Sequence, residues 1–280
     1  MKNSFKLANG TQIPAIGFGT YKIPDGEDAY NSVKEALACG YRHIDTASLY
    51  GNEESVGRAI RDSGIAREDI WVTSKVWDDD QGYEKAKASI ENSLKRLDIG
   101  YIDLMLIHWP IPEGFEGDWA ELNLSTWRAF EEAYKEGKLR AIGVSNFMPK
   151  HLKPLLAKCE IAPMVNQMEI HPTYPQKETV DFCQNRGIVM EAWAPLGRAQ
   201  DLEDPTINAV AAIYNKTPAQ ICLRWAYQHG IVTLPKSTHV ERIRDNRRIF
   251  DFEIHKNEME LLDSLPDDKR ISRHPDNLPR

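Results

Sequence analysis

The hydrophobic pattern of the chain alternates between two kinds of segment. Short apolar runs are followed by longer segments in which apolar residues recur every three or four positions. The first pattern predicts buried β-strands and the second predicts amphipathic helices. The predicted strands are Ile16–Gly19, His43–Asp45, Trp71–Lys75, Ile102–His108, Ala141–Ser145, Met164–Glu169, Val189–Trp193 and Val232–Lys236.

The helical segments between these runs carry recognisable end signals. Several begin with Asp, Thr or Pro and stop at a glycine, which are the residue types that helix capping favours at the two ends. The predicted helices are Asp28–Cys39, Glu53–Ser63, Tyr83–Leu97, Thr126–Glu136, Pro149–Lys158, Lys177–Arg186, Thr217–His229 and Val240–Ile249.

Eight strand–helix units predict an α/β fold, the closed (β/α)8 TIM barrel. Before the first unit, Phe5–Leu7 and Gln12–Pro14 flank an Asn-Gly pair, which is the strongest short-range signal for a β-hairpin. We expect this hairpin to plug the N-terminal end, or bottom, of the barrel. Two further helices, Ile207–Tyr214 and Asn257–Leu265, fall outside the repeat. No Ser/Gly-rich linker divides the chain, so we expect a single domain over residues 1–280.

The composition fits this fold and excludes several classes of partner. Single α/β barrels run to about 250 residues, so a chain of 280 residues needs no second core. A net charge of -7 argues against sequence-independent binding to nucleic acid. No run approaches the roughly 18 apolar residues of a membrane span, and the N-terminus lacks the apolar core of a signal peptide. The four cysteines form no C-x-x-C pair. We expect a monomeric, cytoplasmic protein with reduced thiols and no membrane or nucleic-acid partner.

Four ionisable residues lie at or just after the ends of adjacent predicted strands. Asp45 ends the second strand and Tyr50 follows it, while Lys75 and His108 end the third and fourth. In α/β barrels the active site forms at these C-terminal strand ends, so the four side chains can converge. Each alone has an ordinary structural explanation, as a turn cap, a loop aromatic, a surface lysine or a core histidine. Together they indicate a catalytic set.

The set suits chemistry at a carbonyl group. A carbonyl that receives hydride develops negative charge on oxygen and must be given a proton. Tyr50 can give it if the Lys75 cation lowers the phenol pKa from about 10, and Asp45 would keep a buried Lys75 protonated. A neutral His108 would donate a hydrogen bond that orients the carbonyl. These residues predict proton transfer to a carbonyl but do not by themselves establish hydride transfer.

Three long motifs resemble signatures of the aldo-keto reductases. They are GYRHIDTASLYGNEE, LKRLDIGYIDLMLIHWP and LPKSTHVERIRDN, which occur in the expected order. The similarity covers nearly the whole chain and is nearest to short bacterial members, such as those that reduce 2,5-diketo-D-gluconate or glyoxals.

The resemblance implies an NADPH-dependent reductase of small aldehydes, ketones or dicarbonyls, with NADPH/NADP+ as cofactor. It implies that Tyr50 is the general acid, that Lys75 and Asp45 tune it, and that His108 orients the substrate. The sequence does not choose among the possible carbonyl substrates.

The expected cofactor site begins at the end of the eighth strand. The chain has no complete G-x-G-x-x-G motif, which argues against a Rossmann module. Barrels bind phosphate after strands seven and eight, where Lys236, Ser237, Thr238 and Arg242 combine charge with hydroxyl groups and suit a 2′-phosphate. The resemblance implies that Lys236, Ser237 and Arg242 hold this phosphate and that Asn246 reaches the adenine.

The nicotinamide end is expected at the fifth to seventh strands. Ser145, Asn146 and Gln167 end two of these strands, and their polar groups suit a carboxamide, as in the family pattern. Trp193 offers a flat face for the nicotinamide ring, although a core tryptophan is the alternative. The remaining expected cofactor residues are Gly19 and Thr20 near the ribose, and Ala194, Pro195, Leu196 and Gly197 beside the pyrophosphate.

The substrate is expected to bind among aromatic side chains at the open end of the barrel, here called the aromatic mouth. Tyr21, Trp77 and Trp109 would form an apolar pocket in which His108 is one of the polar groups. The chain after the last helix is short, so we expect it to cover less of this pocket than in longer relatives.

Two other functions are compatible with parts of the pattern. A nucleotide-sensing regulatory protein would bind the cofactor with little turnover, and a Schiff-base aldolase would use Lys75 as nucleophile. No H-E-x-x-H or comparable cluster predicts a metal site.

Overall fold

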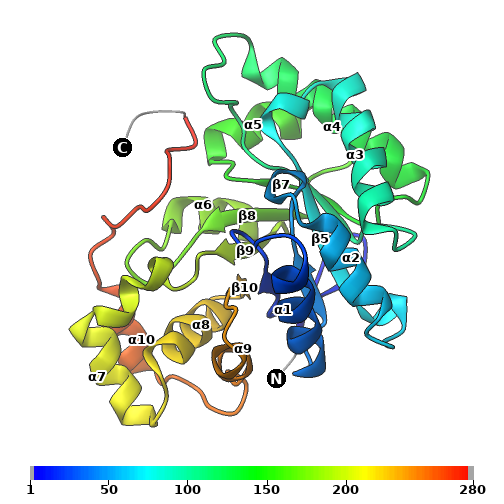
Figure 1. Ribbon diagram of the computed structural model, residues 1–280. Coiled ribbons are helices and arrows are strands. Elements are labelled where there is room, and N and C mark those ends of the chain that lie inside the picture. The colour runs from blue at the N-terminus through cyan, green and yellow to red at the C-terminus, as the bar shows by residue number, and fades with distance from the viewer. Residues whose placement is uncertain (1–2, 277–280) are drawn as a thin grey trace.

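Eight parallel strands form the centre of the molecule, which a computed structural model describes over residues 3–276. The ends of the predicted 1–280 domain, residues 1–2 and 277–280, lie outside the described range. Helices surround the strands (Figure 1). The strands are β3 Phe18–Gly19, β4 His43–Asp45, β5 Trp71–Val76, β6 Leu104–Ile107, β7 Ile142–Ser145, β8 Val165–Glu169, β9 Val189–Trp193 and β10 Ile231–Leu234.

The sheet closes on itself next to β3 and β10. The Gly17 N–H donates to the Thr233 carbonyl at 2.8 Å, and the Thr233 N–H donates to the Ala15 carbonyl at 3.1 Å. A Cβ atom at Gly17 would lie 2.6 Å from Cδ2 of Leu234, so glycine lets the two segments approach. Closure brings the C-terminal ends of the strands to one rim and confirms the predicted (β/α)8 barrel.

An N-terminal hairpin lies at the opposite rim. It pairs β1 Ser4–Lys6 with β2 Gln12–Pro14 in antiparallel register. Asn9 shapes the turn, because its side-chain oxygen accepts from the N–H and hydroxyl of Thr11 at 3.0 and 2.7 Å. The Asn9 amide also donates to the carbonyl of Arg140, just before β7, at 2.9 Å. The hairpin therefore sits where the strands begin, as predicted.

The helices follow the predicted order. Those paired with strands are α1 Glu27–Ala38, α2 Glu53–Arg61, α3 Tyr83–Leu97, α4 Trp119–Lys135, α5 Pro149–Lys158, α6 Lys177–Gln184, α8 Pro218–Gln228 and α9 Val240–Asn246. The two additional helices are α7 Pro205–Tyr214 and α10 Lys256–Asp263. Within residues 3–276, no helix has both the length and the apolar character needed to cross a bilayer.

Helix α4 begins earlier than the sequence predicted. The expected start was Thr126, whereas the helix begins at Trp119. The reason is the Asp118 carboxylate, which accepts hydrogen bonds from the N–H groups of Ala120 and Glu121 at 3.0 and 3.1 Å. An aspartate in this position satisfies N–H groups that have no partner inside the helix, so it fixes the helix start.

Candidate active site

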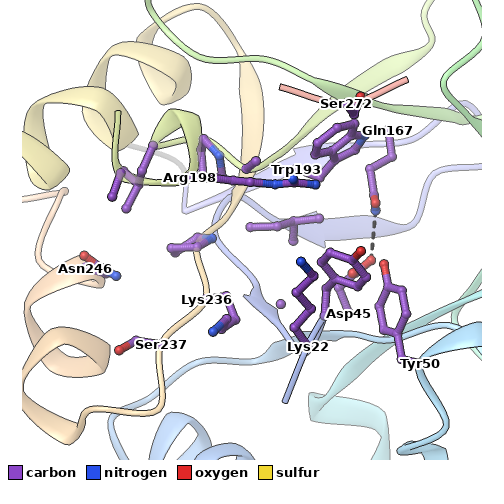
Figure 2. Close-up of a pocket in the computed structure, with 18 of the residues that line it drawn as sticks. Lys22, Asp45, Tyr50, Gln167, Trp193, Arg198, Lys236, Ser237, Asn246 and Ser272 are labelled. Atoms are coloured by element: carbon purple, nitrogen blue, oxygen red, sulfur yellow. Dashed lines mark hydrogen bonds between the residues drawn. The ribbon is translucent and has the colours of Figure 1, made fainter. Parts of the chain in front are cut away.

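A cavity of about 920 Å³ lies at the C-terminal rim of the barrel (Figure 2). This volume is in the range of small-molecule and cofactor sites. Of the predicted residues, those that line it are Gly19, Tyr21, Asp45, Tyr50, Trp77, His108, Trp109, Ser145, Asn146, Gln167, Trp193, Ala194, Pro195, Leu196, Lys236, Ser237, Arg242 and Asn246. The strand-end residues predicted to converge therefore share one cavity.

Three predicted cofactor residues are not on the cavity wall. Thr20 is fully buried, and its hydroxyl donates to the Asp45 carbonyl at 3.0 Å. Gly197 is buried at a positive φ of 55°, where a Cβ atom would lie 2.5 Å from the Asp201 carboxylate. Thr238 is exposed. Thr20 and Gly197 shape loops beside the cavity.

Lys75 lies directly beneath the cavity and is fixed by several acceptors. Its Nζ donates to both carboxylate oxygens of Asp45 at 2.8 Å and to the Thr46 carbonyl at 2.7 Å. Tyr50 Oη is 3.4 Å from the same nitrogen. Lys75 is 1% exposed and Asp45 is 4% exposed, so each charge depends on the other for compensation.

Tyr50 lies in a short 3-10 turn after β4, Ser48–Tyr50, and faces Asp45 in the cavity (Figure 2). The expectation that Lys75 lowers its pKa was wrong. Burial raises the pKa of Tyr50 well above 10, and the negative charge of Asp45 raises it further. The physical reason is that Asp45 compensates the Lys75 cation while the phenol loses its hydration. Tyr50 therefore holds its proton throughout the neutral pH range.

His108 follows β6 and is neutral, as predicted. Burial lowers its pKa well below 6.5, with further contributions from the cations Lys75 and Arg273. Its ring packs edge-on against Trp77, with ring centres 5.0 Å apart, and lies 5.9 Å from the ring of Tyr50. A neutral imidazole keeps one N–H, so His108 can donate a hydrogen bond without carrying charge.

Asn146 connects the end of β7 to the aromatic wall. Its Nδ2 donates to the His108 carbonyl at 2.8 Å, and its Oδ1 accepts from Nε1 of Trp193 at 3.0 Å. The backbone of Asn146 has a φ of 65°, in the left-handed region that asparagine tolerates. Trp193 is thus held by a hydrogen bond and also borders the cavity, which distinguishes it from a purely structural core tryptophan.

Gln167 extends from β8 toward the carboxylate of Asp45. Its Nε2 donates to Oδ2 of Asp45 at 2.8 Å, the bond drawn in Figure 2, and to Oε2 of Glu191 at 3.0 Å. The hydroxyl of Ser145 donates to the Gln167 backbone carbonyl at 2.8 Å. These contacts occupy the N–H groups of the amide and leave its oxygen as the group that can meet a ligand.

Basic side chains line the cavity between its two ends. Figure 2 shows Tyr50 at one end, Ser237 and Asn246 at the other, and Lys22, Arg198 and Lys236 in between. Cations and hydroxyls suit phosphate groups, and the amides near Gln167 suit a carboxamide. The donor set therefore fits a phosphorylated nicotinamide dinucleotide.

Known proteins resemble this chain over nearly its whole length. A model of the aldo/keto reductase family matches residues 15–267. Glyoxal reductase of Bacillus subtilis (strain 168) is 49% identical over 278 residues, which cover 99% of this chain and 98% of that protein. The chain belongs to the aldo/keto reductase family. The predicted resemblance, including the similarity to bacterial members, is confirmed.

Solved structures of aldo-keto reductases share the fold of this chain. MGS-M4, from a deep-sea metagenome library of the Medee basin, has a TM-score of 0.92 at 47% identity and covers 99% of this chain and 100% of its own. The silkworm (Bombyx mori) reductase AKR2E5, in its complex with NADPH, has a TM-score of 0.87 at 35% identity, with 94% of this chain and 88% of its own covered.

The segment that follows α10 reaches the cavity. Figure 1 shows it running from α10 past α6 toward α5. Glu169, at the end of β8, anchors it by accepting from the Ile271 N–H at 2.6 Å and from the Ser272 hydroxyl at 2.7 Å. Ser272 and Arg273 line the cavity as a result.

Arg273 covers the part of the cavity next to Trp109. Its guanidinium lies 4.3 Å from the ring centre of Trp109 and pairs with the buried carboxylate of Asp78 at 2.5 Å. Stacking on an aromatic face and pairing with a buried acid fix this side chain at the mouth. No sequence pattern linked Arg273 to Trp109 or Asp78, because these contacts span a large part of the chain.

Further residues that sequence reasoning missed line the cavity. Lys22 directly follows the predicted Tyr21 and could have been included on that ground alone. The other unpredicted lining residues are Leu49, Glu113, Arg198, Ala199, Leu202, Thr217, Pro218, Ala219, Leu234, Pro235 and Asp245. Over the described part of the chain, no group of three or more His, Cys, Asp or Glu residues is placed to hold a metal ion.

Proposed function

We propose that this chain is an NADPH-dependent reductase that converts the carbonyl group of small aldehydes, ketones or dicarbonyls to an alcohol. The observation that carries the proposal is the hydrogen-bonded set of Asp45, Lys75 and Tyr50 beside a cavity that also holds Lys236 and Arg242. A proton donor and a phosphate site thus share one cavity. Family membership and the NADPH complex of AKR2E5 support the same function.

In this proposal Tyr50 protonates the substrate oxygen. NADPH, when bound, supplies the hydride, which adds to the carbonyl carbon and turns the oxygen into an alkoxide. An alkoxide is a stronger base than a phenolate, so the proton moves to it even though the pKa of Tyr50 is high. Lys75 Nζ, 3.4 Å away, then stabilises the phenolate. Neutral His108 donates a hydrogen bond to the carbonyl oxygen and holds it next to Tyr50.

The cofactor residues divide between the two ends of the cavity. The face of Trp193 and the polar groups of Ser145, Asn146 and Gln167 would hold the nicotinamide. Gly19 and the segment Ala194, Pro195 and Leu196 would border the central part. Lys236, Ser237 and Arg242 would bind the 2′-phosphate, and Asn246 would meet the adenine.

Arg242→Ala is expected to weaken NADPH binding roughly 10- to 100-fold while leaving NADH binding nearly unchanged, because a hydrogen bond to a charged group contributes about 1.5–3 kcal/mol. Only NADPH carries the 2′-phosphate that this guanidinium would bind. Calorimetric titration with each cofactor measures the difference. The matched control is Arg244→Ala on the same helix, because Arg244 pairs with Glu35 at 2.8 Å instead of lining the cavity. An equal loss for both cofactors would move the phosphate site elsewhere.

The substrate class is tested directly by turnover. The aromatic mouth formed by Tyr21, Trp77 and Trp109 suits small carbonyl compounds, and one relative is named for reduction of glyoxal. We expect the purified protein to oxidise NADPH in the presence of glyoxal, methylglyoxal or small aldehydes, with the corresponding alcohol as product. A panel that adds keto-sugars and is run with NADPH and NADH would rank the substrates. Absence of NADPH oxidation across the panel would contradict the proposal.

The two alternative functions predict other results. A Schiff-base aldolase needs a free lone pair on Lys75, whereas the Lys75 N–H groups are bonded to Asp45 and Thr46. Borohydride is therefore expected to trap no substrate adduct on Lys75. A regulatory nucleotide sensor would bind NADPH without the turnover expected above.

A further inference from the structure

Glu191 is a carboxyl group inside the barrel that the proposed proton transfer does not use. It lies on β9, is fully buried, and is not on the cavity wall. Its Oε2 accepts from Nε2 of Gln167 at 3.0 Å, and the same nitrogen donates to Oδ2 of Asp45 at 2.8 Å. Gln167 therefore bridges two carboxyl groups, one from β9 and one from β4.

The two bonds together fix the direction of the Gln167 amide. A primary amide has two N–H donors and one oxygen acceptor. The bond to Asp45 alone would leave the amide plane free to rotate about that bond. The second bond, to Glu191, removes this freedom and determines where the oxygen points. Because Gln167 lines the cavity, its orientation is part of the binding surface.

The surroundings of Glu191 favour a neutral acceptor. Asp45 and His43 face it from β4, Lys75 from β5 and Gln167 from β8, with His43 Nε2 3.7 Å from Glu191 Oε1. Burial and the Asp45 charge raise the pKa of Glu191 to about 8, and burial lowers the pKa of His43 to about 3. At neutral pH Glu191 accepts the hydrogen bond without placing a second negative charge beside Asp45.

We propose that Glu191 is a positioning residue that holds the Gln167 amide in the orientation that receives the nicotinamide carboxamide. The inference rests on the proposed function, because it places the nicotinamide against Gln167. Glu191 acts through Gln167 and needs no contact with the cofactor. Two consequences follow: the contribution of Glu191 is confined to ligands that carry nicotinamide, and it disappears when Gln167 is absent.

The test compares E191M with E191Q by calorimetric titration at neutral pH. Methionine preserves the side-chain volume but removes the acceptor, whereas glutamine keeps a neutral acceptor. The two ligands are NADPH and adenosine 2′,5′-bisphosphate, which carries the 2′-phosphate but no nicotinamide. We expect E191M to bind NADPH about tenfold more weakly than the parent, the equivalent of one lost hydrogen bond. We expect its affinity for the bisphosphate to match the parent, and E191Q to restore most of the NADPH affinity.

Two results would overturn the inference: E191M with parental affinity for NADPH, or E191M with equal losses for both ligands. A second comparison adds E191M to Q167A, and we expect no further loss of NADPH affinity in the double variant. An additional tenfold loss would show that Glu191 acts by another route. If E191M does not fold, E191A is measured in its place against the same two ligands. If the parent protein binds neither ligand, the proposed function is overturned as well. If it binds both, a change in the variants tests the role of Glu191 alone.

Discussion

Tyr50→Phe is expected to lower kcat for carbonyl reduction about a thousandfold, because it removes the proton donor and general acid catalysis contributes roughly 10²–10⁴-fold. NADPH affinity should remain nearly intact. Phenylalanine keeps the ring that packs beside Tyr21 and His108, with ring centres 5.1 and 5.9 Å away. Steady-state kinetics with a saturating aldehyde, together with an NADPH titration, separates the two effects.

The control for this variant is Tyr101→Phe, which removes the same hydroxyl group from a tyrosine outside the cavity. Tyr101 precedes β6 and packs against Arg67. Its variant should turn over like the parent. If Tyr50→Phe retained its turnover, Tyr50 would not be the proton donor, and a water molecule or His108 would have to take that role.

Lys75→Met is expected both to abolish turnover and to lower the free energy of unfolding by about 3–5 kcal/mol. The substitution leaves the Asp45 carboxylate, which is 4% exposed, buried without its cation. It also removes the group that stabilises a Tyr50 phenolate. Urea unfolding at neutral pH measures the stability change, and the NADPH oxidation assay measures the activity.

Two further variants show whether this effect belongs to the buried pair. Lys177→Met breaks the exposed pair of Lys177 with Asp181 on α6 and should change stability by less than about 1 kcal/mol. Adding Asp45→Asn to Lys75→Met removes the unpaired charge and should recover part of the stability but none of the activity. A Lys75→Met protein as stable as the parent would mean that the carboxylate is not compensated by Lys75.

Much of the fold was predictable because the relevant signals are local. Apolar runs, amphipathic periodicity and terminal glycines report on neighbouring residues, and their regular alternation is enough to predict a barrel. The start of α4 was the clearest error. Asp118 is a residue type that caps helices, but the sequence did not show that it does so here. Only the structure shows that α4 begins directly after it.

The convergence of the strand-end residues was predictable, but their electrostatics were not. Asp45, Lys75 and His108 were found because barrel topology brings strand ends together, whatever lies between them in the chain. The pKa of Tyr50 was misjudged, because its direction depends on burial and on how far Asp45 compensates the nearby cation. Neither quantity can be obtained from residue identities.

The sequence by itself determined the barrel and predicted that Asp45, Lys75 and His108 would meet at one rim. The tertiary structure alone decided which groups meet across long stretches of chain. Glu169 holds the tail at Ile271, 102 residues later, and Arg273 pairs with Asp78, 195 residues away. The proposed role of Glu191 likewise depends on its bond to Gln167, which forms only in the folded barrel. Local patterns follow from backbone geometry and hydrophobic periodicity, whereas these contacts and the resulting pKa values depend on distances and burial that exist only once the barrel has closed.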